Sequence, residues 1–83
     1  MTSNVITLTA GNDSENGTNF DDIISSLSGN DTVFGGLGND TIYGDNDNDE
    51  LHGEEGDDSL NAGKGDDIVY GGTGDDRIYA GEG

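Results

Sequence analysis

Aliphatic side chains recur every nine residues along the chain, each in the middle of a short stretch with strand-forming neighbours. Thr41-Ile42-Tyr43 is typical, because β-branched and aromatic residues favour extended backbone. In such a strand the middle side chain points opposite to its two neighbours, so one aliphatic side chain faces inward and two side chains face solvent. The pattern predicts an all-β chain of very short strands. The aliphatic place is filled by Ile6, Ile24, Val33, Ile42, Leu51, Leu60, Val69 and Ile78, with Glu15 as the exception.

The same period organises the whole sequence into repeats. Eight units run from Leu8 to Tyr79 without insertion or deletion, and no linker interrupts them. The units read LTAGNDSEN, GTNFDDIIS, SLSGNDTVF, GGLGNDTIY, GDNDNDELH, GEEGDDSLN, AGKGDDIVY and GGTGDDRIY. We predict one domain over residues 1–83. It comprises an opening strand within residues 1–7 (Val5 to Thr7), the repeats over residues 8–79 and an incomplete repeat over residues 80–83.

The first half of each unit is predicted to be a turn, because it concentrates the glycines. All 16 glycines fall at positions one, two or four of the unit. Glycine adopts positive φ with little strain, and asparagine or aspartate tolerate it next best. Asp47 can therefore take the place of glycine at position four.

One strand per nine residues implies that two units complete one turn of a coil. Strands 18 residues apart then stack in parallel at about 4.8 Å. The sequence predicts a parallel β-roll, a solenoid of two short-stranded parallel sheets with about four turns of 18 residues. One sheet would stack the strands centred on Glu15, Val33, Leu51 and Val69, and the other those centred on Ile6, Ile24, Ile42, Leu60 and Ile78. Glu15 would then lie at an open end, where its carboxylate still reaches water.

The amino-acid composition, in contrast to the repeat pattern, is typical of a disordered chain. Only 28% of its residues are hydrophobic, and its net charge is −17 with two cationic side chains, Lys64 and Arg77. Low hydrophobicity with high net charge leaves too little apolar surface to offset the entropy of folding. No cysteine is present, which excludes disulfides and cysteine-bound zinc as the missing stabiliser. A hard cation remains, since carboxylates are the ligand type in excess.

The charge also excludes several classes of partner. An acidic surface repels nucleic-acid backbones and anionic membranes, so we expect no nucleic-acid binding. No apolar run approaches the length of a transmembrane helix, so no membrane insertion is expected. The first ten residues also lack the charged and apolar regions of a cleaved signal peptide.

Aspartate occupies position six of every unit. Stacking at 18 residues would bring these carboxylates together in pairs, and without a cation they repel. Calcium accepts 6 to 8 oxygens in flexible geometry, and two stacked turns can offer two aspartates and several turn carbonyls. We expect about six calcium ions from three turn pairs on each side of the roll, and a metal-free chain that is unfolded. The predicted side-chain ligands are Asp13, Asp22, Asp31, Asp40, Asp49, Asp58, Asp67 and Asp76. The predicted carbonyl ligands are those of Gly35, Gly36, Leu37, Gly38, Gly44, Asn46, Gly53, Glu55, Gly56, Gly63, Gly65, Gly71 and Thr73.

These repeats resemble the calcium-binding nonapeptide G-G-x-G-x-D-x-U-x of the RTX (repeats-in-toxin) proteins. GGLGNDTIY and GGTGDDRIY match every specified place, and the other units keep the aspartate. The resemblance implies a right-handed roll with calcium held by position-six aspartates and turn carbonyls. It also implies secretion in one step without a cleaved N-terminal signal, and folding outside the cell. In that family the repeats usually adjoin another exported domain, so a fused or parent exported protein is an expected partner.

Several residues have alternative interpretations. The Asx residues at position five are expected to brace the turn backbone rather than bind metal. His52 has no accompanying nucleophile motif, and we expect no enzyme activity. Phe34, His52 and Tyr70 would form an outward ladder that serves cross-strand packing, or else a recognition surface.

Three functions stay open at this point. The first is a calcium-responsive folding module. The second is a surface-recognition or adhesion module for glycan or ice that calcium makes rigid, although position three is too irregular for ice. The third is a structural roll that assembles end to end, since open sheet ends can pair with further copies.

Overall fold

The computed structural model describes residues 4–8, 11–79 and 81, and in this part of the chain all regular structure is β-strand. Each strand has three or four residues and begins just after a glycine-rich turn, except β1, which opens the chain. The strands are β1 (Asn4–Thr7), β2 (Ser14–Asn16), β3 (Asp22–Ser25), β4 (Thr32–Phe34), β5 (Thr41–Tyr43), β6 (Glu50–His52), β7 (Ser59–Asn61), β8 (Ile68–Tyr70) and β9 (Arg77–Tyr79). Among the described residues, no helix is both long enough and apolar enough to cross a membrane.

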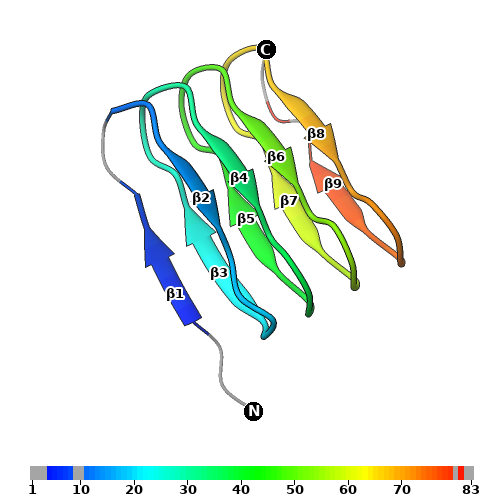
Figure 1. Ribbon diagram of the computed structural model, residues 1–83. Coiled ribbons are helices and arrows are strands. Elements are labelled where there is room, and N and C mark those ends of the chain that lie inside the picture. The colour runs from blue at the N-terminus through cyan, green and yellow to red at the C-terminus, as the bar shows by residue number, and fades with distance from the viewer. Residues whose placement is uncertain (1–3, 9–10, 80, 82–83) are drawn as a thin grey trace.

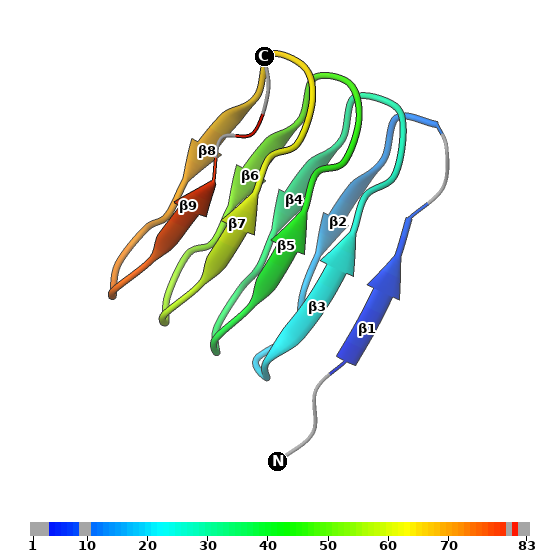
Figure 2. The same ribbon diagram turned by 180° about the vertical axis from the view of Figure 1, so that it is seen from behind.

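Odd-numbered and even-numbered strands form separate sheets that face each other, as Figures 1 and 2 show. One sheet has the order β1-β3-β5-β7-β9 and the other β2-β4-β6-β8, and every pairing is parallel. Each residue pairs with the one 18 positions later, as Ile24 does with Ile42 and Val33 with Leu51. The predicted solenoid of about four turns is therefore confirmed. Its right-handed winding stays a prediction, in line with the usual handedness of parallel crossovers.

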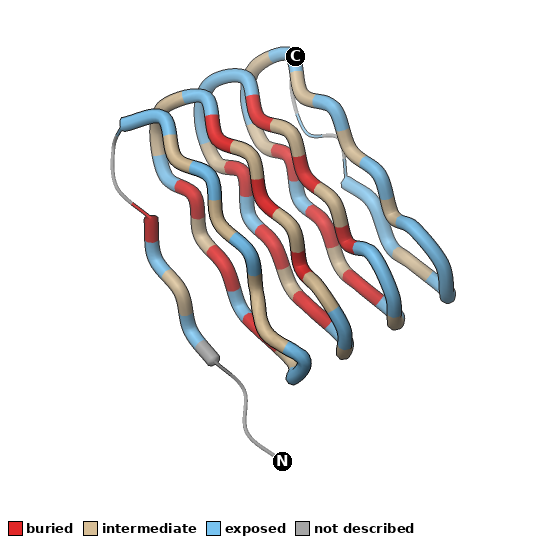
Figure 3. Tube along the Cα trace, in the orientation of Figure 1, coloured by how far each residue is buried: buried red, intermediate tan, exposed pale blue. Residues whose placement is uncertain are grey.

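The core is a single layer of side chains between the two sheets. Figure 3 marks the buried residues in red along the backbone. Position-eight residues dominate this layer, since Ile24, Val33, Ile42, Leu51 and Leu60 are completely buried. The layer ends where the stack ends. Val69 and Ile6 are only partly buried against it. Ile78 is 49% exposed although it occupies position eight, because no described strand stacks beyond β9.

Position one of each unit also faces inward, which the sequence analysis did not foresee. It lies two residues beyond position eight, so its side chain returns to the same face. Ala62 and Ser26 are completely buried there, and Leu8 is 9% exposed. The core thus has a second column of small residues beside the aliphatic one.

The outer face of the smaller sheet carries the predicted ladder. The rings of Phe34 and His52 stack with centroids 4.6 Å apart, and those of His52 and Tyr70 with centroids 4.8 Å apart. His52 Nε2 also lies 2.6 Å from Glu50 Oε2. The rings cover one another face to face, so the ladder performs the cross-strand packing that was expected of it.

Some predicted segments lie outside the described residues. These are residues 1–3 of the opening segment, residues 9 and 10 of the first repeat, and residues 80, 82 and 83 of the incomplete repeat. Where the sequence predicts the opening strand, β1 spans Asn4–Thr7 and pairs with β3.

Candidate metal sites

The turns owe their shape to glycine, but for two different reasons. At positions two and four the backbone needs positive φ, as at Gly36 (87°) and Gly38 (92°). Asp47 adopts a φ of 73° at position four, as the sequence predicted. At position one the reason is space. A Cβ added to Gly35 would lie 2.6 Å from Asp40 Oδ2 and 2.8 Å from Gly53 O.

The position-six aspartates point inward and form a column along each edge of the roll, which we call the inner column. Asp22, Asp31, Asp40, Asp49 and Asp58 are each at most 3% exposed. In every stacked pair the backbone N–H of one aspartate donates to Oδ1 of the aspartate 18 residues later, at 2.7–2.9 Å. All six predicted pairs are therefore in register. The pairs are Asp13–Asp31, Asp22–Asp40, Asp31–Asp49, Asp40–Asp58, Asp49–Asp67 and Asp58–Asp76.

At most of these positions the second carboxylate oxygen, Oδ2, accepts no hydrogen bond. Within the described residues, five buried Oδ2 atoms have no hydrogen-bond partner, namely those of Asp31, Asp40, Asp49, Asp58 and Asp67. Burying a charged oxygen without a partner costs several kcal/mol, on the order of 3 or more. A native fold tolerates this where a ligand supplies the missing partner.

The pKa values of the inner column also indicate that its carboxylates lack a positively charged partner. Burial raises the pKa of Asp40 and of Asp49 to about 7, and that of Asp58 to about 6. Burial also raises the pKa of Asp31 and that of Asp67. The charge of neighbouring aspartates raises these pKa values further, while backbone N–H donors oppose the rise. At neutral pH the column therefore favours binding a positive charge, either a proton or a metal ion.

Backbone carbonyls meet the unpartnered carboxylates from the adjacent turn. The point where a Gly53 Cβ would lie is 2.6 Å from Asp58 Oδ2 and 2.8 Å from Gly71 O. On the opposite edge, a Gly44 Cβ would lie 2.9 Å from Asp49 Oδ2 and 2.6 Å from Ala62 O. A carboxylate oxygen and a carbonyl oxygen of the next turn thus converge in a space that glycine leaves open.

The set of donor atoms suits a hard cation. No group of three or more His, Cys, Asp or Glu side chains converges in the described part of the chain, so carbonyls must complete each site. A mixture of carboxylate and carbonyl oxygens in flexible turns is the ligand set that calcium prefers. The residues present therefore fit this ion.

The predicted carbonyl ligands fall into groups. The carbonyls of Gly35, Gly53 and Gly71 lie beside inward carboxylates of the neighbouring turn. Position-four carbonyls such as those of Gly38 and Gly56 face the next turn. The Gly44 carbonyl already accepts a hydrogen bond from the Ser26 hydroxyl at 2.8 Å. The remaining assignments, which include all of position three, stay predictions. They are Gly36, Leu37, Asn46, Glu55, Gly63, Gly65 and Thr73.

The sequence analysis missed some participants. The Ala62 carbonyl lies beside Asp49, and the sequence did not predict it because alanine takes the place of glycine at position one of that unit. Asp45 and Asp47 also have a role, since their carboxylates accept backbone N–H groups of Leu27 (3.3 Å) and Gly29 (2.7 Å) in the preceding turn of that edge. The sequence carried a signal for these contacts, because Asp45 and Asp47 lie 18 residues after Leu27 and Gly29.

Position five forms a second column, the outer column, on the surface of each edge. Its side-chain oxygens accept the backbone N–H of the residue 18 positions later, at 2.7–2.9 Å. The predicted bracing role is confirmed for these residues. The acceptors are Asn12, Asp21, Asn30, Asn39, Asn48 and Asp57.

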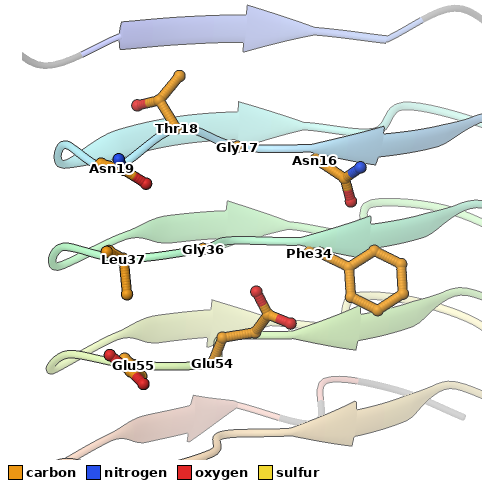
Figure 4. Close-up of a pocket in the computed structure, with 9 residues that line it drawn as sticks. All are labelled: Asn16, Gly17, Thr18, Asn19, Phe34, Gly36, Leu37, Glu54 and Glu55. Carbon is orange, nitrogen blue, oxygen red and sulfur yellow. The ribbon is translucent and has the colours of Figure 1, made fainter.

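A shallow groove of about 550 Å³ crosses three turns on one edge, between Asn16 and Glu55 (Figure 4). It lies outside the inner column, because its lining includes no position-six aspartate.

Comparison with known proteins gives one match. A family model described as the RTX calcium-binding nonapeptide repeat matches residues 16–51 and 52–83, with four copies. Comparisons with curated proteins and with solved structures found no match. The matched ranges cover more than half of the chain and contain most of the stacked turns described above.

Proposed function

Because the chain belongs to the RTX calcium-binding nonapeptide repeat family, we propose that it is a module that passes from disorder to a β-roll when Ca²⁺ enters its stacked turns. The membership and the solenoid together support calcium binding. The observation that carries the folding step is the row of buried, unpartnered Oδ2 atoms in the inner column.

The metal-free roll has too little stabilising free energy to stay folded. Each unit buries at most one aliphatic side chain at position eight, which contributes about 1.5–3 kcal/mol at best. The conformational entropy lost when the backbone of a unit is ordered opposes that gain. Unpaired buried carboxylates add a further penalty. Binding free energy from calcium therefore becomes folding free energy.

Calcium binding would also reduce the net negative charge of the chain. The expected number of about six ions would change the net charge from −17 to −5, since −17 + 12 = −5. Magnesium is a poorer fit, because it demands a small octahedral site and retains its waters. Asp40, Asp49 and Asp58, with the carbonyls that approach them, would hold the ion.

RTX repeats occur in secreted proteins, and a calcium-dependent fold suits that setting. We expect affinities near 10⁻⁴–10⁻³ M, the range of extracellular calcium modules. In a calcium-poor cytoplasm the chain would stay unfolded and fit for export, and it would fold after leaving the cell.

The test compares two adjacent aspartates that differ only in which way they point. Asp58→Asn removes a charge from the inner column, and Asp57→Asn removes the same charge from the outer column. Calcium and magnesium titrations followed by calorimetry would be run on both variants and on the native chain. We expect Asp58→Asn to weaken calcium binding at least tenfold, and Asp57→Asn to change it less than twofold.

Equal weakening in the two variants would mean that the charge of the molecule, rather than a built site, attracts the ion. Equal responses to calcium and magnesium would contradict the proposed selectivity. Native binding of calcium without a gain in β-structure would contradict the folding step.

A further inference from the structure

One turn of the roll keeps the position-six aspartate but satisfies it with the protein's own donors. This turn, residues 17–21, joins β2 to β3, and Asp22 follows it as the first residue of β3. The backbone N–H of Thr18 donates to Asp22 Oδ2 at 2.7 Å, and the Thr18 hydroxyl donates to Asp22 Oδ1 at 2.8 Å. The Phe20 N–H in turn donates to the Thr18 hydroxyl oxygen at 3.1 Å.

The next turn on the same edge, residues 35–39, differs at the same places. Gly36 stands where Thr18 stands, and Gly38 where Phe20 stands, as the 18-residue register requires. Figure 4 shows Thr18, Gly36 and Glu54 as successive members of this row of turns. Asp40 at the end of the second turn has an Oδ2 without a hydrogen-bond partner among the described residues.

The backbones of the two turns differ as well. Gly36 and Gly38 both have positive φ, whereas neither Thr18 nor Phe20 does. Threonine is β-branched and phenylalanine is bulky, and both adopt positive φ only at a cost. The chain therefore takes another path through this turn, and that path brings the Thr18 N–H and hydroxyl to the carboxylate.

We propose that the Asp22 turn excludes calcium and that Thr18 is the residue that excludes it. The inference rests on the proposed function, because it concerns which of the stacked turns fill with the ion. Two donors direct the positive ends of their dipoles at the carboxylate, in the place that a cation would otherwise take. For calcium to bind Asp22 through Oδ2, the Thr18 N–H bond would have to break and the turn would have to adopt strained φ values.

The consequence is a turn that is closed by hydrogen bonds and needs no metal. Asp22 still contributes to the stack, since its N–H donates to Asp40 Oδ1 at 2.9 Å. Of the six turn pairs expected to bind calcium, the pair formed by the Asp22 and Asp40 turns is the one that would remain without an ion. The other five pairs, beginning with Asp13–Asp31, would still bind calcium.

The test converts this turn into the consensus form. Thr18→Gly together with Phe20→Gly changes GTNFDDIIS into GGNGDDIIS, which matches every specified place of the repeat. Native mass spectrometry at saturating calcium counts the ions on each chain, and far-UV circular dichroism confirms that each is folded. We expect the double variant to hold one more ion than the native chain. Adding Asp22→Asn to it should return the count to the native value.

A matched pair of single variants gives an independent test on the native background. Asp22→Asn should leave the ion count unchanged, and Asp40→Asn should lower it by one. An ion lost with Asp22→Asn, or no ion gained by the glycine variant while it is folded, would overturn the inference. Failure of every chain to bind calcium would instead contradict the proposed function, so the two failures are distinguishable.

Discussion

Two columns of side chains run next to each other along each edge of the roll, and they use the same chemical groups differently. Asp57 belongs to the outer column, is exposed, and accepts the N–H of Asp75 from the following turn at 2.8 Å. Asp58 belongs to the inner column, is 2% exposed, and accepts the N–H of Asp40 from the preceding turn at 2.8 Å. The outer carboxylate is exposed to solvent, whereas the inner one keeps a buried oxygen without a partner.

The comparison shows that acidity alone does not distinguish the two columns. In the outer column, a position can hold either an amide or a carboxylate, and Asn39 and Asp57 serve as equivalent acceptors. Only an oxygen is needed there. In the inner column every member is aspartate. The proposed calcium sites account for this, because a buried cation site requires charge as well as an oxygen. The invariance of the inner column across the repeats is therefore a sign of its function.

The largest expected difference between the columns comes from double variants. Asp40→Ala with Asp58→Ala removes two adjacent members of the inner column and should abolish folding at calcium concentrations that fold the native chain. Asn39→Ala with Asp57→Ala removes their outer neighbours and should cost about 1 kcal/mol for each hydrogen bond lost. Calcium titrations followed by circular dichroism measure both. Similar losses in the two double variants would remove the distinction between the columns.

Acid should act on the inner column through Asp40, Asp49 and Asp58. The folded-state pKa values of Asp40 and Asp49 are about 7 and that of Asp58 is about 6, against an ordinary value of 3.8. A raised folded-state pKa stabilises the fold below the unfolded value, and that contribution is lost as pH rises through the folded value. The chelated chain should therefore gain β-structure between pH 7 and pH 4, while calcium affinity falls. Far-UV circular dichroism in chelator checks this, and loss of β-structure on acidification would contradict it.

Core substitutions extend the comparison to the neighbouring strand positions. Ile42→Ala empties a completely buried place and should destabilise the calcium-loaded roll by about 2–5 kcal/mol. Tyr43→Ala, next to it, removes a side chain that is 40% exposed and should cost about 1 kcal/mol or less. Urea unfolding at fixed calcium gives both values. A larger cost for Tyr43→Ala would mean that the outer face, rather than the core, stabilises the sheets.

The smallest expected effects lie within the outer column. Asn39→Asp preserves the oxygen that accepts the Asp57 N–H, so stability should change by less than about 0.5 kcal/mol. Asn39→Ala removes that oxygen and should cost about 1 kcal/mol. Thermal unfolding at saturating calcium separates the two. If Asn39→Asp instead added a calcium ion, the outer column would also be a metal site.

The fold was predictable because the same types of residue recur at fixed positions of the nine-residue unit. The offset of 18 between Ile24 and Ile42 followed from one strand per nine residues, and the structure shows that register. The stacking of Asp40 on Asp58 followed from the same arithmetic. Repetition in phase made these inferences secure, since each unit supports the others.

Other features depend on where backbone groups point, which a period does not encode. The inward direction of Ser26 and Ala62 arises from strand geometry continuing past position nine into the turn. The separate reasons for glycine at positions one and two appear only when neighbouring oxygens are located, as around Gly35. The closure of Asp22 by Thr18 requires the actual turn conformation, because the sequence shows only a departure from consensus.

The most direct test of the central claim is a calcium titration of the native chain followed by far-UV circular dichroism, with magnesium as the control. We predict a disordered spectrum in chelator at pH 7.5 and a steep, cooperative gain of β-signal with calcium but not with magnesium, because each interior turn serves two sites. A chain that is already β-structured in chelator at that pH, or one that remains disordered in millimolar calcium, would contradict the account.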